Sequence, residues 1–227
     1  MIRMFHVFKT FPNKVSALWD ISIHIKKGEF VFLIGPTGAG KTTFLKLIYR
    51  GILPSKGQVI VDGVNLSRLK QSYVPFLRRE IGVVFQDFKL LYDRNVFENV
   101  AFSLRVTGVK NAIIKKEVNE ILNIIGLSHK KNTNPHLLSG GEQQKLCIAR
   151  AVVSRPLILL TDEPTGNLDP DTSWEIMKLL FKINIWGTTV IMASHDKLMV
   201  DRAQKRVIRL EQGRLVSDTM KGVYSKE

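Results

Sequence analysis

The chain has 227 residues, of which 44% are hydrophobic, and 34 Lys and Arg against 20 Asp and Glu give it a formal net charge of +14. This length favours one compact domain with an insertion, and no apolar run reaches the ~18–20 residues that a membrane-spanning helix needs. The first residues lack the pattern of a secretory signal, and the single Cys147 excludes an internal disulfide, so a reducing compartment is expected.

The positive charge is compatible with binding to nucleic acid or to an anionic membrane surface. The basic residues are scattered, however, and their densest groups are short. No zinc-ligand spacing, arginine-rich tract or RNA-binding aromatic motif accompanies them. We therefore favour contact with an anionic membrane surface or a protein partner over nucleic acid.

The first fifth of the chain predicts strands followed by a glycine-rich loop. Short alternating runs at 3–7 and 20–25 are typical of antiparallel strands, and the continuous apolar run at 29–34 is typical of a buried parallel strand. The sequence G-P-T-G-A-G-K-T then occupies 35–42, and 42–49 has helical composition. A strand, a loop of the pattern G-x-x-x-x-G-K-[ST] and a helix together predict a phosphate-binding loop.

Each part of this loop has an expected role in nucleotide binding. Glycines let backbone N–H groups wrap around phosphates, and the following helix N-terminus adds unpaired donors. Lys41 is expected to reach the β- and γ-phosphates, Thr42 to bind Mg²⁺ and Thr43 to contact the α-phosphate. The predicted nucleotide-binding residues here are Gly35, Pro36, Thr37, Gly38, Ala39, Gly40, Lys41, Thr42 and Thr43.

A helical region follows a further strand at 59–61. Residues 96–104, 112–125 and 141–154 are expected to be helices, and 112–125 has the apolar spacing of an amphipathic one. We interpret about 87–155 as a helical insertion in an α/β core formed by about 1–86 and 156–227.

Two more buried strands deliver polar residues at their ends. The run at 157–161 is followed by Asp162 and Glu163, and the run at 189–194 by His195. Ligands in α/β folds bind beyond the carboxyl ends of parallel strands. Asp162 is therefore expected to hold Mg²⁺ and Glu163 to polarise the attacking water. An acidic pair at a solvated strand end is the alternative.

A second glycine-rich segment, Leu138-Ser139-Gly140-Gly141-Glu142-Gln143, matches the signature of the ABC-type ATPases. With the phosphate-binding loop, it makes the chain resemble that family from about residue 1 to 215. The offset of Ser139 and Glu142 is also that of a capping box, so a well-capped helix is the alternative, although a cap does not need two glycines. The resemblance implies that Ser139, Gly140, Gly141 and Glu142 bind the γ-phosphate held by a second copy, giving a head-to-tail homodimer with two ATP molecules.

The resemblance implies further roles and a fold. Gln86 resembles the Q-loop glutamine, which contacts water and Mg²⁺, and His195 resembles the switch histidine at the γ-phosphate. Residues 166–169 resemble the D-loop, and Phe11 resembles the aromatic that stacks on adenine, although two nearby phenylalanines could take that place. The implied fold is an α/β P-loop NTPase core of the RecA type with an N-terminal antiparallel β-subdomain and an inserted α-helical subdomain.

Residues 74–87 and 90–100 resemble the branch of the family that acts in bacterial cell division. This implies a peripheral ATPase on the cytoplasmic face of the plasma membrane, whose ATP-driven dimer closure moves a transmembrane partner. The partner is expected to dock near 86–103. The apolar residues of that region are Leu90, Leu91, Tyr92, Val96 and Phe97.

Other branches and classes remain open from the sequence. They include the ATPase of a lipoprotein-release or macrolide-type export system, an importer or exporter ATPase with a true substrate, a slowly hydrolysing scaffold, and a soluble ABC protein that acts on nucleic acid. The last usually has two cassettes or a long coiled-coil insertion, and this chain has neither.

Overall fold

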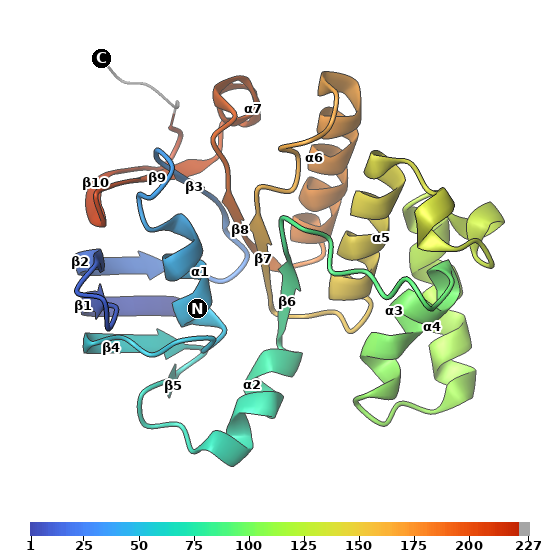
Figure 1. The fold of residues 1–227 in the computed structure, drawn as a ribbon, viewed down its shortest axis with the longest axis horizontal. Coiled ribbons are helices and arrows are strands. Elements are labelled where there is room, and N and C mark those ends of the chain that lie inside the picture. The colour runs from blue at the N-terminus through green and yellow to red at the C-terminus, as the bar shows by residue number, and fades with distance from the viewer. Residues whose placement is uncertain (223–227) are drawn as a thin grey trace.

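The computed structural model describes residues 1–222 and contains two β-sheets with helices around them (Figure 1). The first sheet is antiparallel, with strand order β2-β1-β4-β5. Its strands are β1 (Ile2–Thr10), β2 (Ser16–Ile25), β4 (Lys56–Val61) and β5 (Val64–Asn65). The antiparallel strands expected at 3–7 and 20–25 are confirmed, and both extend beyond those limits.

The second sheet has strand order β10-β9-β3-β8-β7-β6, and every pairing in it except that of β9 with β10 is parallel. The two central strands, β3 (Phe30–Ile34) and β8 (Thr189–Ala193), are buried at every position, which accounts for their continuous apolar sequences. The remaining strands are β6 (Ile81–Val84), β7 (Ile158–Asp162), β9 (Arg206–Glu211) and β10 (Arg214–Thr219). The hairpin of β9 and β10 was not expected from the sequence.

Helix α1 (Lys41–Ile48) packs between the two sheets (Figure 1). Its side chains Phe44, Leu47 and Ile48 are buried in one apolar cluster with residues of β1, β2 and β3. The helix begins immediately after the phosphate-binding loop. Packing on both sheets therefore fixes the loop beside the carboxyl end of β3.

The remaining helices lie around the parallel sheet and to one side of it. Helices α3 (Val96–Arg105), α4 (Asn111–Ile124) and α5 (Gly140–Val152) gather on one side of the molecule, beyond α6 (Pro170–Ile185) (Figure 1). They confirm the helices expected at 96–104, 112–125 and 141–154 to within a few residues. The short helices α2 (Val74–Arg79) and α7 (Lys197–Ala203) and the 3₁₀ turns η1 (Gln71–Tyr73), η2 (Ser128–Lys130) and η3 (Pro135–Leu137) complete the helical elements of the described residues.

The expected α/β fold, with an antiparallel sheet beside a mainly parallel one, is confirmed. The division into a core and a helical insertion at 87–155 stays a prediction. Within residues 1–222, no helix has both the length and the apolar character that crossing a bilayer requires.

Candidate functional site

The phosphate-binding loop is built on close backbone contacts that only glycine allows. Gly35 has φ +146°, and a Cβ there would lie 2.1 Å from the carbonyl oxygen of Leu210. Gly40 has φ +101°, and a Cβ there would lie 2.5 Å from the carbonyl oxygen of Ala17. The loop is therefore held between β9 and β2, with its backbone fixed before any ligand binds.

The first turn of α1 can accept an anion. Its N-cap is Gly40, which has no side chain to bond the first N–H groups, and the first turn contains no acidic residue. Unpaired donors at a helix N-terminus are the usual phosphate site. Lys41, only 8% exposed, folds back over the loop, and its Nζ donates to the carbonyl oxygens of Gly35 at 2.7 Å and Pro36 at 3.2 Å.

Thr42 and Asp162 together offer a site for a hard cation. The Thr42 hydroxyl donates to Asp162 Oδ2 at 2.8 Å, joining the start of α1 to the end of β7. Among residues 1–222, no group of three or more His, Cys, Asp or Glu could hold a metal. One carboxylate and one hydroxyl suit Mg²⁺, because that ion is usually bound by few protein ligands plus substrate phosphates. Gln86 lies exposed in the turn after β6.

Burial raises the pKa of Asp162 above its ordinary value. The hydrogen bond from Thr42 opposes this effect, and the neighbouring charge of Glu163 adds to it. The ionised carboxylate is therefore held in an environment that disfavours its charge. A bound cation would relieve that cost, so the electrostatics of the site fit the predicted Mg²⁺.

The carboxylate of Glu163 lies between a lysine and a histidine. Glu163 Oε2 is 3.0 Å from His195 Nδ1, and Oε1 is 4.0 Å from Lys41 Nζ. The backbone of Glu163 is left-handed, with φ +50°, and its N–H donates to the carbonyl oxygen of Ala193 at 3.0 Å. This bond continues the pairing of β7 with β8 and so brings the carboxylate to the histidine that follows β8.

The segment 139–142 forms the capping box that the sequence allows. Ser139 Oγ accepts from the N–H of Glu142 at 3.3 Å, and Glu142 Oε2 accepts from the N–H of Ser139 at 2.9 Å. Lys130 also donates to Glu142 at 2.5 Å. This bond is the main cause of the lowered pKa of Glu142, and the bonds from Ser139 contribute less. Glu142 is thus engaged inside its own subunit, where it fixes the conformation of the loop.

The two glycines of this segment have different surroundings. A Cβ on Gly141 would lie 2.4 Å from Thr172 Cγ2 at the start of α6, whereas a Cβ on Gly140 would meet only Leu168 Cδ2, at 3.6 Å. Gly141 is therefore required by packing between α5 and α6. No contact within the subunit fills the space beside Gly140, and this exposed residue leaves the start of α5 accessible to a ligand.

The chain is similar in sequence to known proteins over nearly its whole length. A family model described as ABC transporter matches residues 18–166. The chain belongs to the ABC transporter family. It is an ATP-binding cassette and an ATPase. It is 54% identical to the cell division ATP-binding protein FtsE of Bacillus subtilis, over 99% of this chain and 98% of the relative. It is 51% identical to FtsE of Mycobacterium tuberculosis, over 100% and 99%.

Solved structures show the same fold. A dimeric ATP-binding cassette in a post-hydrolysis state bound to ADP and Pi has a TM-score of 0.89 and 34% identity, with 99% of this chain and 100% of that chain covered. A dimeric bacterial ABC transporter cassette also has a TM-score of 0.89, with 35% identity and the same coverage.

The aromatic residue expected to stack on adenine lies in the turn of the β1–β2 hairpin of the cassette. Phe11 is half-buried, and the Lys9 ammonium is 5.3 Å from its ring centre. Phe8 is engaged elsewhere, edge-on to Trp19 at 5.5 Å. The hairpin reaches the phosphate-binding loop through Ala17 and Leu18, which touch Gly40. Phe11 is thus carried by a hairpin whose second strand borders the site.

A groove between α2, β6, α3 and α5 of the cassette encloses about 630 Å³. It coincides in part with the expected docking region. Of the apolar residues named there, Leu90 and Val96 are buried in the core and cannot face a partner. Phe85, Phe102 and Val106, which were not among those residues, line this groove together with Leu91.

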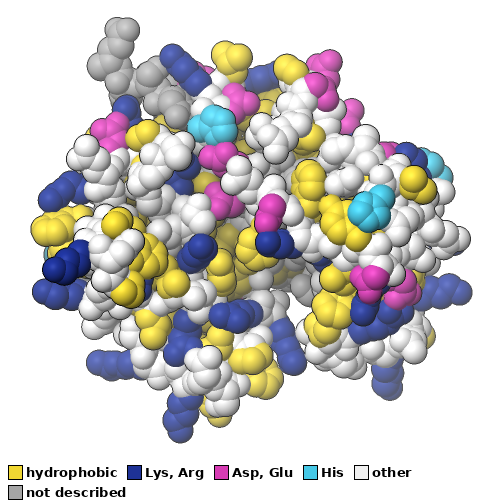
Figure 2. All heavy atoms as spheres, in the orientation of Figure 1, with side chains coloured by type: hydrophobic (Ala, Val, Ile, Leu, Met, Phe, Trp, Pro, Cys, Tyr) yellow, Lys and Arg dark blue, Asp and Glu magenta, His cyan; other side chains and the backbone are white. Residues whose placement is uncertain are grey.

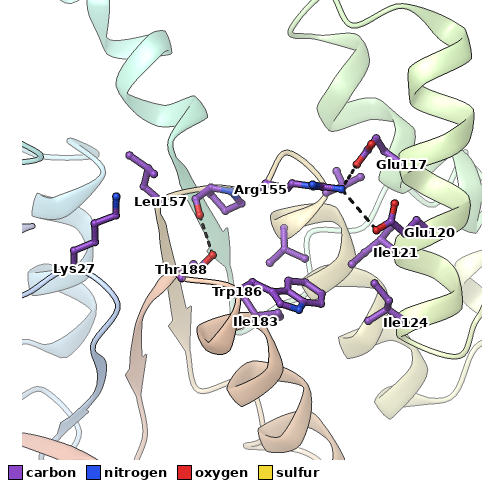
Figure 3. Close-up of a pocket in the computed structure, with 14 residues that line it drawn as sticks. Lys27, Glu117, Glu120, Ile121, Ile124, Arg155, Leu157, Ile183, Trp186 and Thr188 are labelled. Atoms are coloured by element: carbon purple, nitrogen blue, oxygen red, sulfur yellow. Dashed lines mark hydrogen bonds and ion pairs between the residues drawn. The ribbon is translucent and has the colours of Figure 1, made fainter.

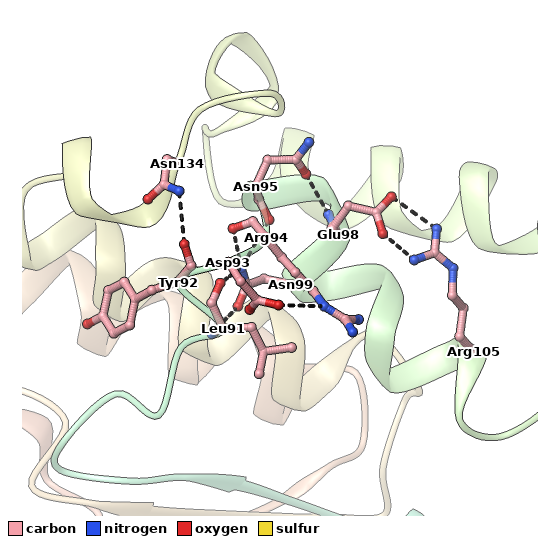
Figure 4. Close-up of polar contacts among 9 residues, drawn as sticks. All are labelled: Leu91, Tyr92, Asp93, Arg94, Asn95, Glu98, Asn99, Arg105 and Asn134. Atoms are coloured by element: carbon pink, nitrogen blue, oxygen red, sulfur yellow. Dashed lines mark hydrogen bonds and ion pairs between the residues drawn. The ribbon is translucent and has the colours of Figure 1, made fainter.

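A buried asparagine fixes the backbone at the edge of the groove (Figure 4). Asn99 accepts from the N–H of Leu91 and donates to the carbonyl oxygens of Leu91, Arg94 and Asn95. Tyr92 is 40% exposed and stacks on His136 at 4.3 Å, while Asn134 donates to its carbonyl oxygen. Residues 91–95 are therefore rigid, and Tyr92 faces outward on them.

A separate cavity of about 660 Å³ lies at the amino ends of β3, β7 and β8, the edge opposite the phosphate-binding loop (Figure 3). Arg155 crosses its mouth to Glu117 and Glu120, and Trp186 forms one wall. None of the residues predicted to bind nucleotide or metal lines it.

We expect Asp162→Asn to stabilise the nucleotide-free cassette while abolishing ATP hydrolysis. The native pKa of Asp162 is above its unfolded value of 3.8, so the native state binds more protons and stability falls as pH rises from that value through the native pKa. Solvent screens a partly exposed group, so we expect a gain of about 1 kcal/mol in the free energy of unfolding at neutral pH. In a chain of this size, that gain raises the melting temperature by about 2–4 °C.

Calorimetry from acid to neutral pH would measure this effect, with Asp171→Asn on the exposed start of α6 as the control. As pH rises, the wild type and the control should lose stability relative to Asp162→Asn, because only they carry the carboxyl group with the raised pKa. An Asp162→Asn protein that melts below the wild type at neutral pH would contradict the expectation.

Gly141→Ala and Gly140→Ala should differ in stability although they are neighbours. The Cβ at 141 overpacks the contact with Thr172 and should cost about 1–3 kcal/mol, whereas the Cβ at 140 meets only ordinary contacts. Denaturant unfolding of both variants measures the difference, and equal midpoints would show that the α5–α6 contact yields without cost.

Proposed function

We propose that this cassette is the ATP-hydrolysing subunit of a membrane complex that resembles FtsE with FtsX in bacterial cell division. The convergence of Lys41, Asp162 and Glu163 at one sheet edge supports the hydrolytic role most directly. The similarity to proteins named FtsE over nearly the whole chain supports the cell-division role.

ATP binds through the phosphate-binding loop, with its adenine toward Phe11 on the β1–β2 hairpin. The loop N–H groups and Lys41 hold the phosphates, and Thr43 contacts the α-phosphate. Thr42 and Asp162, with Gln86, would hold Mg²⁺, which when bound would supply positive charge against the phosphate oxygens.

Glu163 orients the attacking water and attracts its proton. Its carboxylate is anchored by His195 on one side and approaches Lys41 on the other, so the group is fixed before reaction. Preorganised charge of this kind is the main source of catalysis in phosphoryl transfer. His195 is 59% exposed, so its imidazole remains accessible to the γ-phosphate.

Two copies assemble head to tail around two ATP molecules. Ser139, Gly140 and Gly141 of one copy face the γ-phosphate held by the loop of the other, and Glu142 fixes their conformation. The exposed position of Gly140 at a helix start supports this arrangement. The similar solved structures are described as dimers.

Glu163→Gln should bind ATP without hydrolysing it and remain as a closed dimer. The substitution keeps the size of the side chain but removes the charge that attracts the proton. With ATP and Mg²⁺, sedimentation velocity should show dimers of Glu163→Gln and monomers of Lys41→Ala, which loses the phosphate contact. Turnover by Glu163→Gln at the wild-type rate would remove Glu163 from the reaction.

The groove of about 630 Å³ receives a cytoplasmic segment of the transmembrane partner. Its walls combine Phe85, Leu91 and Phe102 with the cations Arg78, Arg79 and Lys89. On the face shown in Figure 2, Lys and Arg side chains surround α2 and the antiparallel sheet, whereas Asp and Glu gather above the ends of the central strands. The cassette therefore sits peripherally on the cytoplasmic face of the plasma membrane, with its basic side available to anionic lipid.

Phe85→Ser combined with Val106→Ser should reduce co-purification of the co-expressed FtsX-like partner by about tenfold, because both exposed side chains line the groove. Basal ATPase activity should be retained. Ile113→Ser on the outer side of α4 removes a comparably exposed side chain outside the groove and serves as the control. Undiminished partner recovery would place the docking surface elsewhere.

A further inference from the structure

The turn after β6 contains two successive residues in a conformation that favours glycine. Phe88 has φ +55° and Lys89 has φ +51°. Side chains with a Cβ are disfavoured there because the Cβ approaches the following carbonyl oxygen. Within the turn, the N–H of Lys89 donates to the carbonyl oxygen of Asp87 at 2.5 Å. Contacts from outside the turn also hold it.

Helix α5 supplies these contacts from two consecutive turns of one face. Arg150 donates to the carbonyl oxygen of Phe88 at 2.8 Å and to that of Lys89, and Cys147 Sγ donates to the carbonyl oxygen of Phe88 at 3.1 Å. Burial raises the pKa of the Cys147 thiol to about 12, so the thiol keeps its proton. Arg150 forms no ion pair with any carboxylate of residues 1–222, so these carbonyl oxygens are what its partly buried guanidinium binds.

The held turn is a wall of the groove. Phe85, Lys89 and Leu91 line the groove, and so does Arg150 itself. Asn99 fixes the backbone of Leu91 just beyond the turn (Figure 4). The conformation of 85–91, and with it the shape of the groove, is thus set by side chains of α3 and α5.

The other end of α5 is the segment that faces the γ-phosphate in the proposed dimer. A helix of 13 residues is about 20 Å long and moves as a rigid unit. A displacement of Ser139 and Gly140 would therefore reach the turn at 88–89 through the bonds of Arg150 and Cys147.

We propose that Arg150 is a positioning residue that couples the phosphate-facing end of α5 to the groove, by holding Phe88 and Lys89 in their left-handed conformation. The coupling rests on the proposed function, since it presumes the ATP-bridged dimer and a partner in the groove. The contact by which Arg150 holds the turn, however, lies within one subunit and needs neither ATP nor a partner.

Arg150→Lys tests the coupling, because lysine keeps the charge but cannot reach two carbonyl oxygens with a planar fork. In the isolated protein, hydrogen exchange at 86–91 should become about tenfold faster, as expected when bonds from a charged donor are lost. In a Glu163→Gln background, ATP with Mg²⁺ should change exchange at 86–91, and Arg150→Lys should abolish that change. Basal ATPase activity should survive, whereas stimulation by the co-expressed membrane partner should be lost.

Relief of the backbone strain should rescue the variant. Lys89→Gly permits the left-handed conformation without penalty, so Arg150→Lys with Lys89→Gly should regain much of the slow exchange and the stimulation. Lys89→Ala removes the same side chain without that freedom and should rescue neither. Arg155→Lys is the matched control, because Arg155 is also left-handed, at φ +53°, but is exposed and pairs with Glu117.

Each outcome decides a separate point. Unchanged exchange at 86–91 in Arg150→Lys would show that Arg150 does not hold the turn. Faster exchange with the ATP response and partner stimulation intact would show a purely structural bond and overturn the coupling. A wild type that neither dimerises with ATP nor associates with a membrane partner would refute the proposed function, while the exchange data would still decide whether Arg150 holds the turn.

Discussion

The hydrogen bond from the N–H of Glu163 to the carbonyl oxygen of Ala193 sets the geometry on which the site depends. It extends the parallel ladder of β7 and β8 by one step beyond Asp162 and turns the chain into a left-handed conformation. Without that turn, Glu163 would continue the strand. Its side chain would then lie on the opposite face of the sheet from that of Asp162, because side chains alternate along a strand. With it, Asp162 meets Thr42 on α1 while Glu163 meets His195 beyond β8.

The acidic side chains at this edge of the sheet lower the stability of the fold, and packing elsewhere must offset that loss. Asp162 is partly buried with Glu163 beside it, and the nearby groups that offset their charge are Lys41, Lys46, Thr42 and His195. The large apolar clusters on both faces of the parallel sheet provide the stability that makes this tolerable. Active sites commonly retain such destabilising arrangements because the reaction requires them.

Local sequence patterns predicted those features of the fold and the site whose conformation is set by residues adjacent in the sequence. The loop at 35–42, the buried strands and the capping box at Ser139 each follow from a few consecutive side chains and the backbone they favour. The hairpin of β9 and β10 was missed because β10 alternates between exposed and half-buried residues, and this leaves a weak apolar signal.

Contacts between distant segments could not be predicted in this way. Nothing around Gly141 reveals that Thr172 of α6 occupies the space of its missing side chain. Leu90 and Val96 carry the same apolar character as Leu91, and only the packing of α3 separates buried from groove-lining residues. The left-handed pair at 88–89 lacks glycine, so the usual signal of such a turn is absent and its cause lies some sixty positions away on α5.

The contact of Gly141 with Thr172 has a consequence for an assembled pair of subunits. Thr172 is capped by Asp169, and the segment that leads there begins with Gly166, whose N–H donates to the carbonyl oxygen of Glu163. Within one subunit, a short path of contacts therefore joins Glu163 to Gly141. In the proposed dimer these two residues of one subunit would serve different nucleotides, so a change in the backbone at one nucleotide would reach the other.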